Sequence, residues 1–513
     1  MKKVLSLVLS AVLSFSALVG CDAGSSKMKG ASDKIVQENY EGRTFYEVFV
    51  RAFKDSNGDG IGDLKGVEES LDYLKELGVN GIWLMPITDS ESYHGYDTTD
   101  YYTINPDYGT MDDLKSLIKE ANKRDIKIIM DLVLNHTSVD HPWFIEASSD
   151  ENSEYRDYYV WTDDMSKASE GTTMNTNRWT QNGSKEELYE SVFWSGMPDL
   201  NYDNEKVVEE AKDVAKYYLD LGIDGFRLDA VKWISDDDEK NVEFWKDFSK
   251  YVKSINEDAI LVGEVWDKPY SIYTYAGGLD SFFDFSLGDA VVKALYNKSF
   301  SSLVDTFNKN YDMYLAQNKD FVLATFLYNH DQNRIMSTLN GDTEMAKMAA
   351  AIYLTLPGTP YIYYGEEIGM TGTKPDEKIR EPFIWSSTDL SQNTTWEAST
   401  NDISKVALDV QEKDDNSLYN FYKELLNVRL NRNSLRLGTV ENISQEDKSI
   451  LVMKRNYESE ETFVIINSSN EEKEATLPSG KYNILFTSDK ERESENTLEE
   501  KVTIKPHEVL IVY

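Results

Sequence analysis

Three acidic residues each follow an apolar run typical of a buried β-strand: Asp229 in "GFRLDAVKW", Glu264 in "LVGEVW" and Asp331 in "LYNHDQN". If these runs are parallel strands of one sheet, their carboxyl ends meet at the same edge, where such sheets bind their ligands. Carboxyl groups gathered there can attack as nucleophiles, donate protons or stabilise positive charge. We therefore predict a catalytic centre built on these three side chains.

The separation of two of these carboxyl groups indicates the reaction. Asp229 and Glu264 end consecutive strands, which lie about 4.8 Å apart in a sheet. Their carboxyl groups would then be about 5–5.5 Å apart, as in glycosidases that retain anomeric configuration, whereas inverting enzymes need about 6.5–9.5 Å. Arg227 points to the same side as Asp229 and would keep it ionised. Glu264, facing two other carboxylates, is expected to stay protonated, and Asp331 would stabilise charge on the ring.

Eight apolar runs, mostly separated by amphipathic helices, supply the elements that position these side chains. They are "TFYEVFVRAF", "GIWLMP", "IKIIMDLVLNH", "GIDGFRLDA", "AILVGEVW", "SFFDFSL", "ATFLYNHD" and "PYIYYGEE". Continuous apolar runs of this kind are typical of parallel strands buried on both faces. The pattern predicts a (β/α)₈ TIM barrel, in which chemistry takes place at the C-terminal ends of the strands.

Two segments interrupt or follow this β/α pattern. Residues 137–204 are polar, rich in Tyr, Trp, Asn and Asp, and without a clear period, which predicts a domain inserted after the third strand. Residues 436–513 carry short alternating runs such as "TFVIIN" and "VLIVY", which predict an antiparallel β-sandwich. The barrel domain is then formed by residues 40–136 and 205–435.

The N-terminal segment has the pattern of an export signal. Residues 1–20 contain two lysines, an uncharged apolar run and small residues directly before Cys21, which is the only cysteine among 513 residues. The sequence "LVGC" resembles the lipobox of bacterial lipoproteins, which predicts a lipid anchor at Cys21 outside the cytoplasm; an ordinary cleaved signal is the alternative. Residues 21–39 are interpreted as a tether. A single cysteine rules out a disulfide framework.

The charge balance narrows the class of partner. Lys and Arg total 53 against 91 Asp and Glu, a net charge of −38 at pH 7. Such a surface disfavours nucleic acid and anionic membrane surfaces, and it suits a neutral substrate or cations. Oligomeric state is left open.

Histidines are scarce, and their positions indicate more than packing. Of the five histidines, His94, His136 and His330 lie at strand ends or beside the acidic residues above. No His-x-x-x-His pattern or Cys cluster supports a zinc site. Aromatic residues near the same edge, among them Trp266 and Tyr328, could stack on sugar rings or simply pack.

Five short motifs carry a resemblance to a known family. They are "DLVLNH" (131–136), "MPDLN" (197–201), "GFRLDAVKW" (225–233), "GEVW" (263–266) and "LYNHDQ" (327–332). In order and spacing these resemble the signature regions of the α-amylase family, glycoside hydrolase family 13. "MPDLN" has the form found in members intermediate between the oligo-1,6-glucosidase and neopullulanase types. The resemblance extends from Tyr40 to the C-terminus.

The resemblance assigns roles to individual residues. It implies Asp229 as nucleophile, Glu264 as acid/base and Asp331 as transition-state stabiliser, acting on α-1,4 bonds of starch-derived glucans. It also implies that the following residues line the subsite of the attacked glucose: Arg227, His136, His330, His94 and Tyr96. Asp97 and Arg380 are similar to a pair that closes one end of the cleft in exo-acting relatives. An exo-acting α-glucosidase, a 4-α-glucanotransferase and a non-catalytic glycan-binding protein remain alternatives.

The stretch "DSNGDGIGDLKG" (55–66) predicts a structural calcium site. Its spacing is close to that of an EF-hand loop, but Gly66 stands where the bidentate glutamate belongs, and a strand precedes it. The oxygen donors expected to bind Ca²⁺ are Asp55, Asn57, Asp59, Ile61 through its carbonyl, and Asp63. A metal-free turn is the alternative.

Relatives with a second calcium ion, between the barrel and the inserted domain, use residues matching Asn135 and Asp199 together with a backbone carbonyl near a histidine. That last position is Trp233 in this chain, so the sequence leaves the second site open.

Overall fold

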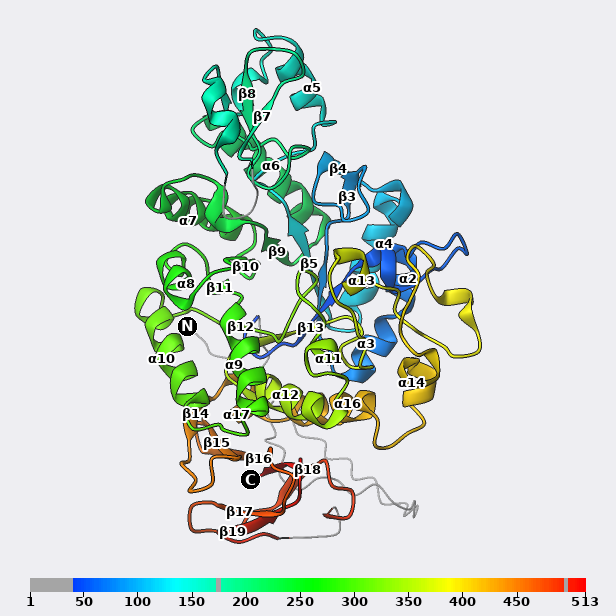
Figure 1. The fold of residues 1–513 in the computed structure, drawn as a ribbon, viewed down its shortest axis with the longest axis vertical. Coiled ribbons are helices and arrows are strands. Elements are labelled where there is room, and N and C mark those ends of the chain that lie inside the picture. The colour runs from blue at the N-terminus through cyan, green and yellow to red at the C-terminus, as the bar shows by residue number, and fades with distance from the viewer. Residues whose placement is uncertain (1–39, 172–176, 493–496) are drawn as a thin grey trace, which may run out of the picture.

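The computed structural model describes residues 40–171, 177–492 and 497–513. Eight parallel strands pair in the order β11-β10-β9-β5-β2-β1-β13-β12. They are β1 (Phe45–Val48), β2 (Gly81–Leu84), β5 (Lys127–Leu132), β9 (Gly225–Leu228), β10 (Ile260–Gly263), β11 (Ser281–Phe282), β12 (Ala324–Thr325) and β13 (Thr359–Tyr363). A parallel bridge between Phe283 and Ala324 joins the two ends of this sheet and closes the barrel (Figure 1). All eight predicted strands are present, and the TIM-barrel prediction is confirmed.

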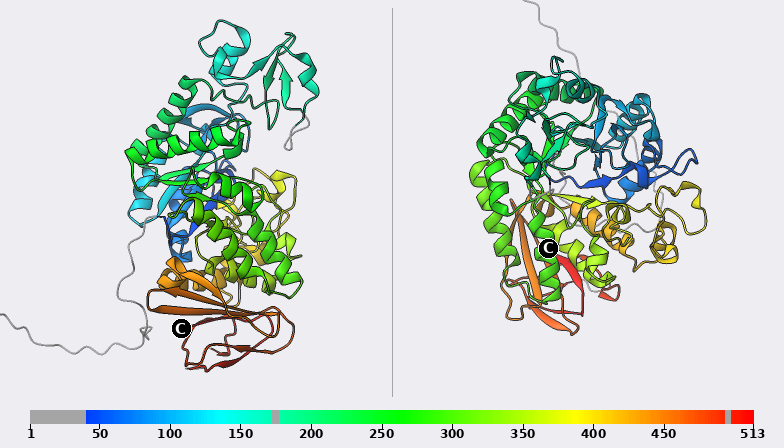
Figure 2. Two further views of the ribbon diagram at one scale, coloured as in Figure 1. Left: turned by 90° about the vertical axis from the view of Figure 1, so that its left-hand side faces the viewer. Right: turned by 45° about the horizontal axis from the view of Figure 1, so that its top comes forward.

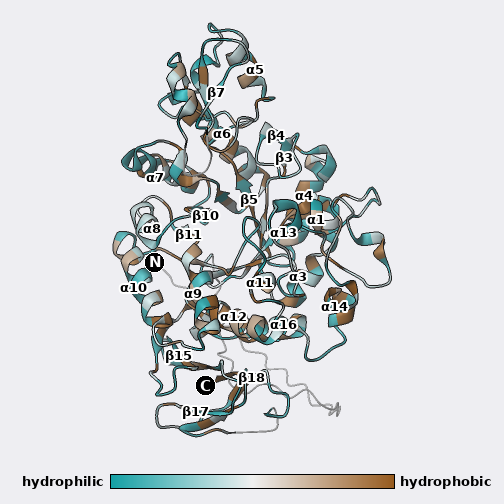
Figure 3. Cartoon of the chain, viewed as in Figure 1, coloured by the Kyte–Doolittle hydropathy of each residue, from teal (hydrophilic) through white to brown (hydrophobic). Residues whose placement is uncertain are grey.

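Helices cover the outside of the barrel. The main ones are α2 (Leu64–Glu69), α3 (Leu71–Leu77), α4 (Met111–Asn122), α6 (Glu205–Leu221), α7 (Asp238–Ile255), α9 (Phe285–Tyr296), α10 (Leu303–Gln317), α12 (Thr343–Thr355) and α16 (Leu418–Leu430). They carry both polar and apolar residues, as the mixed colours of α6 and α10 show (Figure 3). Because these helices shield the strands from water, strands such as β2 and β9 are buried along their whole length.

A short hairpin between β2 and α4 was not predicted. Its strands are β3 (Thr88–Ser90) and β4 (Thr98–Ile104), and its loop carries His94, Tyr96 and Asp97. The sequences "TDS" and "TTDYYTI" are polar for most of their length. They lack the apolar run from which the barrel strands were predicted.

The segment between β5 and α6 forms a separate domain. It contains helix α5 (Pro142–Ser149) and a three-stranded antiparallel sheet of β6 (Trp161–Thr162), β8 (Leu188–Glu190) and β7 (Trp179–Gln181). Figure 2 shows this domain and the C-terminal domain at opposite ends of the barrel. The inserted domain therefore stands at the barrel end from which the long loop after β5 emerges.

The C-terminal domain consists of two antiparallel sheets. One contains β14 (Thr439–Asn442), β15 (Ile450–Tyr457), β16 (Glu460–Asn467), β20 (Val509–Val512) and β18 (Ile484–Thr487), and the other pairs β17 (Lys473–Thr476) with β19 (Lys501–Ile504). A shared apolar core lies between them, as expected for a sandwich. A short helix, α17 (Asn433–Leu437), spans the predicted boundary at residue 435.

The predicted export signal, Cys21 and the tether lie outside the described residues. Within the described part of the chain, no helix combines the length and the apolar character needed to cross a membrane.

Candidate active site

A cavity of about 390 Å³ lies at the C-terminal ends of the barrel strands. Most of the side chains predicted to form the site line it: His94, Tyr96, His136, Asp229, Glu264, Asp331 and Arg380. They come from the β3–β4 hairpin, from the loops after β5, β9, β10 and β12, and from the segment after β13. The barrel therefore brings together residues that are up to about 290 positions apart in the chain.

Arg227 lies beneath the cavity and contacts both carboxyl groups of the predicted acid/nucleophile pair. One guanidinium nitrogen, Nη1, donates to Asp229 Oδ1 at 2.7 Å, and Nη2 lies 2.7 Å from Glu264 Oε2. Nη1 also donates to Asp131 Oδ1 at 2.8 Å. Arg227 is 1% exposed, and a buried charge of this kind needs partners on every side. The sequence predicted its contact with Asp229 but not those with Glu264 and Asp131.

Glu264 has the proton affinity that an acid catalyst needs. Burial raises the pKa of Glu264 to about 7, with further contributions from the negative charges of Asp229 and Asp331, while Arg227 opposes the rise. The sequence attributed the raised pKa to the neighbouring carboxylates alone. In the folded chain, removal from water is the largest cause.

Asp331 is surrounded by positive charge. His330 Nε2 lies 3.1 Å from Asp331 Oδ2, and Arg380 Nη2 donates to Asp331 Oδ1 at 2.9 Å. Burial alone would raise the pKa of Asp331, but the charges of His330 and Arg380 hold it well below its usual value. On its other side, His330 contacts the carboxylate of Glu47. The two carboxylates outweigh burial and raise the pKa of His330 to about 9, so this histidine is charged at neutral pH.

His136 and His94 are held neutral and present defined ring atoms. Burial lowers the pKa of each. His136 Nε2 lies 3.0 Å from the carbonyl oxygen of Tyr96, so this nitrogen carries the proton. His94 Nδ1 accepts from the Tyr96 amide at 3.1 Å, so its proton lies on Nε2. His94 can therefore donate a hydrogen bond to a sugar hydroxyl without carrying charge.

Tyr96 contacts both the charged group around Arg227 and the charged group around Asp331. Its hydroxyl donates to Asp131 Oδ2 at 2.9 Å and lies 2.7 Å from His330 Nε2, and its ring stacks on that of His330. One face of the ring is therefore used for packing inside the protein.

Asp97 and Arg380, which are similar to a pair that closes one end of the cleft in exo-acting relatives, have separate partners in this structure. Asp97 is buried and accepts hydrogen bonds from the hydroxyls of Ser90 and Ser92. Arg380 instead contacts Asp331 and, at 3.4 Å, Asp376. The turn that carries Asp97 folds back on β3, so Asp97 does not line the cavity, whereas Arg380 does.

Several residues of the site were not predicted. Asp131 and Glu47 hold Arg227 and His330 from inside strands β5 and β1. Other residues of the cavity wall come from the inserted domain, the segment after β9 and the segment after β13: Phe193, Trp194, Met197, Trp233, Lys374 and Asp376. The sequence held a signal for four of them. Asp131 and Glu47 are acidic residues inside apolar runs, and Met197 and Trp233 lie in the "MPDLN" and "GFRLDAVKW" motifs.

A family model described as "Alpha amylase, catalytic domain" matches residues 47–438. The chain belongs to the α-amylase family. It is a glycoside hydrolase of the α-amylase type, as the sequence indicated.

Individual relatives agree with this assignment. The chain is 48% identical to α-amylase 3 of Dictyoglomus thermophilum over 431 residues, which cover 83% of this chain and 85% of the relative. It is 31% identical to an oligo-1,6-glucosidase of Bacillus cereus over 546 residues, covering 91% and 97% of the two chains. The crystal structure of the α-amylase from H. orenii superposes with a TM-score of 0.86 at 41% identity and covers 93% of this chain and 99% of that chain.

The predicted calcium loop of this glycoside hydrolase is a series of tight turns. Asp55 Oδ1, Asn57 Oδ1 and Asp59 Oδ1 each accept a hydrogen bond from the amide two residues later. Asp63 differs, because its carboxylate caps α2 through the amide of Gly66 and accepts from Ser56. Within the described residues, no group of three His, Cys, Asp or Glu side chains converges as for a metal ion. The hard oxygen donors nevertheless match the chemistry of Ca²⁺.

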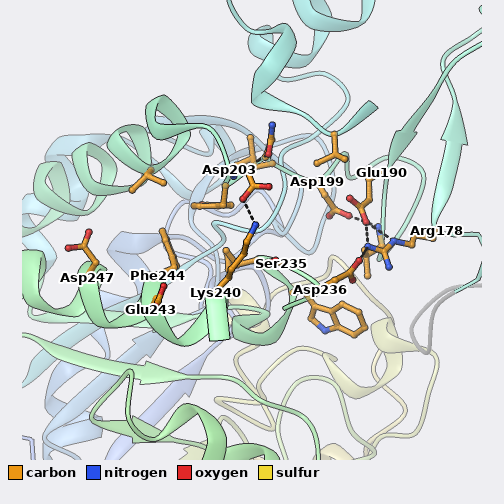
Figure 4. A pocket seen from close by; sticks show the side chains of 18 residues that line it. Arg178, Glu190, Asp199, Asp203, Ser235, Asp236, Lys240, Glu243, Phe244 and Asp247 are labelled. Carbon is orange, nitrogen blue, oxygen red and sulfur yellow. Dashed lines mark hydrogen bonds and ion pairs between the residues drawn. The ribbon is translucent and has the colours of Figure 1, made fainter. Parts of the chain in front are cut away.

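The second position, between barrel and inserted domain, contains an unpaired oxygen. Asn135 is 1% exposed; its amide nitrogen donates to Asp199 Oδ1 at 2.8 Å, but its carbonyl oxygen has no hydrogen-bond partner. Burial and the negative charge of Glu190 raise the pKa of Asp199 well above its usual value. An orphaned oxygen beside Asp199, whose carboxyl group is repelled by that of Glu190, fits a cation. We call Asn135, Glu190 and Asp199 the junction site. Figure 4 shows two of these residues, Glu190 and Asp199.

Proposed function

We propose that this protein hydrolyses α-1,4-glucosidic bonds of starch-derived glucans with retention of configuration. The main observation behind this proposal is that the Arg227 guanidinium contacts both Asp229 and Glu264 at the floor of the cavity. Two carboxyl groups bound to one guanidinium support the short separation of a retaining enzyme, which has no water between carboxylate and sugar.

The reaction then proceeds in two steps. Arg227 binds Asp229 through Oδ1, so the other carboxylate oxygen, Oδ2, attacks the anomeric carbon. The C–O bond to the leaving glucan breaks, and Glu264 transfers its proton to the departing oxygen. In the second step Glu264, now ionised, takes a proton from water, the water oxygen attacks the anomeric carbon, and Asp229 is released. Asp331, ionised by His330 and Arg380, stabilises the positive charge that develops on the ring in both steps.

Neutral and charged donors of the cavity would hold the glucose unit that is attacked. His94 is uncharged, and its Nε2–H can donate to a sugar hydroxyl without the cost of desolvating an ion. Arg380 and Asp331 lie together on another side of the cavity. An uncharged α-glucan agrees with the strongly acidic surface of the protein.

A second candidate activity is transfer of the glycosyl group to another sugar, as in a 4-α-glucanotransferase. It is favoured by two tryptophans at the cavity, Trp194 and Trp266, whose side chains are 53% and 48% exposed. Trp266 lies two residues after Glu264, and its inner face stacks on Phe285 at 5.0 Å. An exposed indole face beside the proton donor can stack on an acceptor sugar in place of water.

The test is the replacement of Asp229 by Asn, which preserves shape and removes the nucleophilic charge. With maltooligosaccharides, Asp229→Asn should lose at least about a thousandfold in kcat, because the covalent step is lost. Asp220→Asn, which replaces an exposed carboxylate of α6, is the matched control. Proton NMR of the first product should show the α-anomer. An Asp229→Asn enzyme as active as the parent, or a β-anomer, would overturn the mechanism.

Products separate hydrolysis from transfer and exo from endo action. A time course with starch, maltotriose, pullulan and cyclodextrin should show short maltooligosaccharides from the start if cleavage is internal. Glucose alone would indicate an exo-acting α-glucosidase. Products longer than the substrate would indicate the glucanotransferase.

We also propose structural calcium at two positions. Asp55, Asn57 and Asp59, with the Ile61 carbonyl, would hold one ion through hard oxygen donors; Asp63 would have to give up its helix cap to join them. Asn135, Glu190 and Asp199 would hold the second ion, which the orphaned Asn135 oxygen supports. Calcium at either site would fix loops and take no part in bond cleavage.

Export and lipid anchoring at Cys21 complete the proposal. They are supported by the lysines, the apolar run and the single cysteine of residues 1–21. Cys21→Ser should release the protein from the membrane fraction of the expressing bacterium. Equal membrane retention of the variant would refute the anchor.

A further inference from the structure

A cleft of about 490 Å³ lies beside the catalytic cavity, between the inserted domain and the segment that joins β9 to α7. Its wall contains six acidic side chains, Glu190, Asp199, Asp203, Asp236, Glu243 and Asp247, and two basic ones, Arg178 and Lys240 (Figure 4). Trp233 lines both this cleft and the catalytic cavity. The Trp233 side chain therefore lies between the charged residues of the cleft and the catalytic cavity.

Arg178 bridges the two parts of the protein across this cleft. It directly precedes β7, in the inserted domain, and its Nε donates to Glu190 Oε1 at 2.6 Å. Its Nη2 donates to Asp236 Oδ2, also at 2.6 Å, on the barrel segment that follows η4 (Val231–Trp233). The view in Figure 4 shows Arg178 between these two carboxylates, with Asp199 next to Glu190.

Glu190 is linked both to Arg178 and to Asp199. Its carboxylate accepts a hydrogen bond from Arg178 Nε at 2.6 Å, and it lines the same cleft as Asp199. The backbone also couples them, because the amide of Asp199 donates to the Glu190 carbonyl at 3.0 Å and that of Val192 donates to Asp199 Oδ2 at 2.8 Å. Without a metal ion, Arg178 is thus the positive charge that compensates the buried Glu190–Asp199 pair.

We propose that Arg178 and calcium are alternative counter-charges for Glu190. With Arg178 in place the junction stays assembled without metal, and calcium binds the junction site only by drawing the Glu190 carboxylate away from the guanidinium. Arg178 therefore weakens calcium binding at the junction and keeps the junction assembled when a chelator is present. This inference rests on the proposed junction calcium.

The test is a calcium titration of metal-free proteins that all carry Asp59→Asn, which weakens the other proposed site at an exposed position. Arg178→Gln should bind calcium chloride roughly tenfold more tightly than the parent, since one charge-assisted hydrogen bond no longer competes. Its melting temperature should depend on calcium more strongly than that of the parent, whereas Arg178→Lys should stay close to the parent on both measures.

Arg156→Gln is the matched control. Arg156 is another arginine of the inserted domain, and it binds Glu187 at 2.5 Å without contacting Glu190. Its replacement loosens the same domain and should leave the calcium affinity unchanged. Equal affinity of Arg178→Gln and the parent, or an equal gain in Arg156→Gln, would overturn the proposed competition. If neither the parent nor Arg178→Gln binds calcium, the proposal that the junction site holds calcium is refuted.

A measurement on the parent protein covers the case in which Arg178→Gln does not fold. In crystals grown with calcium chloride, the Glu190 carboxylate should lie on the metal with Asn135 and Asp199, and Arg178 should keep only Asp236. Calcium on Asn135 and Asp199 with Glu190 still bonded to Arg178 would contradict the proposal.

Discussion

The raised pKa of Glu264 predicts the alkaline limit of activity. Only the protonated form of Glu264 can donate to the leaving oxygen, and burial raises its pKa from 4.5 to about 7. At pH 7 an ordinary glutamate would be protonated in only ~0.3% of molecules, whereas Glu264 is protonated in about half of them. The folded environment therefore increases the fraction of active enzyme roughly 150-fold at this pH.

The assay is the pH profile of kcat/KM with maltotriose between pH 5 and 9. We expect a plateau below about pH 6 and a roughly tenfold loss for each pH unit above about 7. A maltosyl fluoride substrate provides the control, because fluoride leaves without protonation. Its first step should keep its rate across the same range. Glu264→Gln should still release a first equivalent of fluoride, although its turnover slows because the base of the second step is lost, and it should not cleave maltotriose.

Two results would refute this reasoning. A profile that stays flat to pH 9 with maltotriose would show that proton donation does not depend on a group with a pKa near 7. An identical alkaline loss with both substrates would show that the titrating group acts on binding or on the nucleophile instead of on the leaving oxygen.

Three further outcomes are expected. Because the pKa of buried His330 is raised from 6.5 to about 9, it contributes about 3 kcal/mol of stability that is present below pH 6.5 and lost as pH rises through 9. Glu47→Gln should shrink this pH dependence in urea unfolding, and an unchanged dependence would contradict it. Chelation should lower the melting temperature, and Asp59→Asn should reduce that effect; equal melts with and without chelator would exclude the first loop. Arg455→Met should cost about 3–5 kcal/mol, because Arg455 donates to carbonyls at the barrel–sandwich contact; a loss below 1 kcal/mol in calorimetry would argue against it.

Local sequence patterns were sufficient to predict the barrel and the convergence of Asp229, Glu264 and Asp331 on one cavity. Each barrel strand is an apolar run buried on both faces, so it differs in composition from the polar helices and loops around it. Asp229, Glu264 and Asp331 interrupt such runs at the point where a strand ends. Their convergence follows from the parallel arrangement alone, and no knowledge of individual contacts was needed.

Contacts that depend on register could not be predicted in this way. Asp131 lies directly opposite Arg227 because β5 and β9 pair in that register. A shift of one residue would turn Asp131 to the other face of the sheet. Glu47 reaches His330 because β13 pairs with both β1 and β12, which places β1 two strands away from the end of β12. The β3–β4 hairpin was not predicted because its strands are mostly polar and lack the apolar run that marks the barrel strands.

These unpredicted partners are what distinguishes the three carboxyl groups of the site. Asp331 lies against charged His330 and Arg380, and Glu47 keeps His330 charged, so Asp331 remains an anion. Glu264 meets a single guanidinium that it shares with Asp229 and Asp131, and burial prevails over that shared charge. Asp131 thus draws on the same positive charge that would otherwise ionise Glu264 more fully. Replacing Asp131 by Asn should therefore lower the pKa of Glu264 and move the alkaline limit of activity below that of the parent, whereas an unchanged limit would show that burial alone sets it.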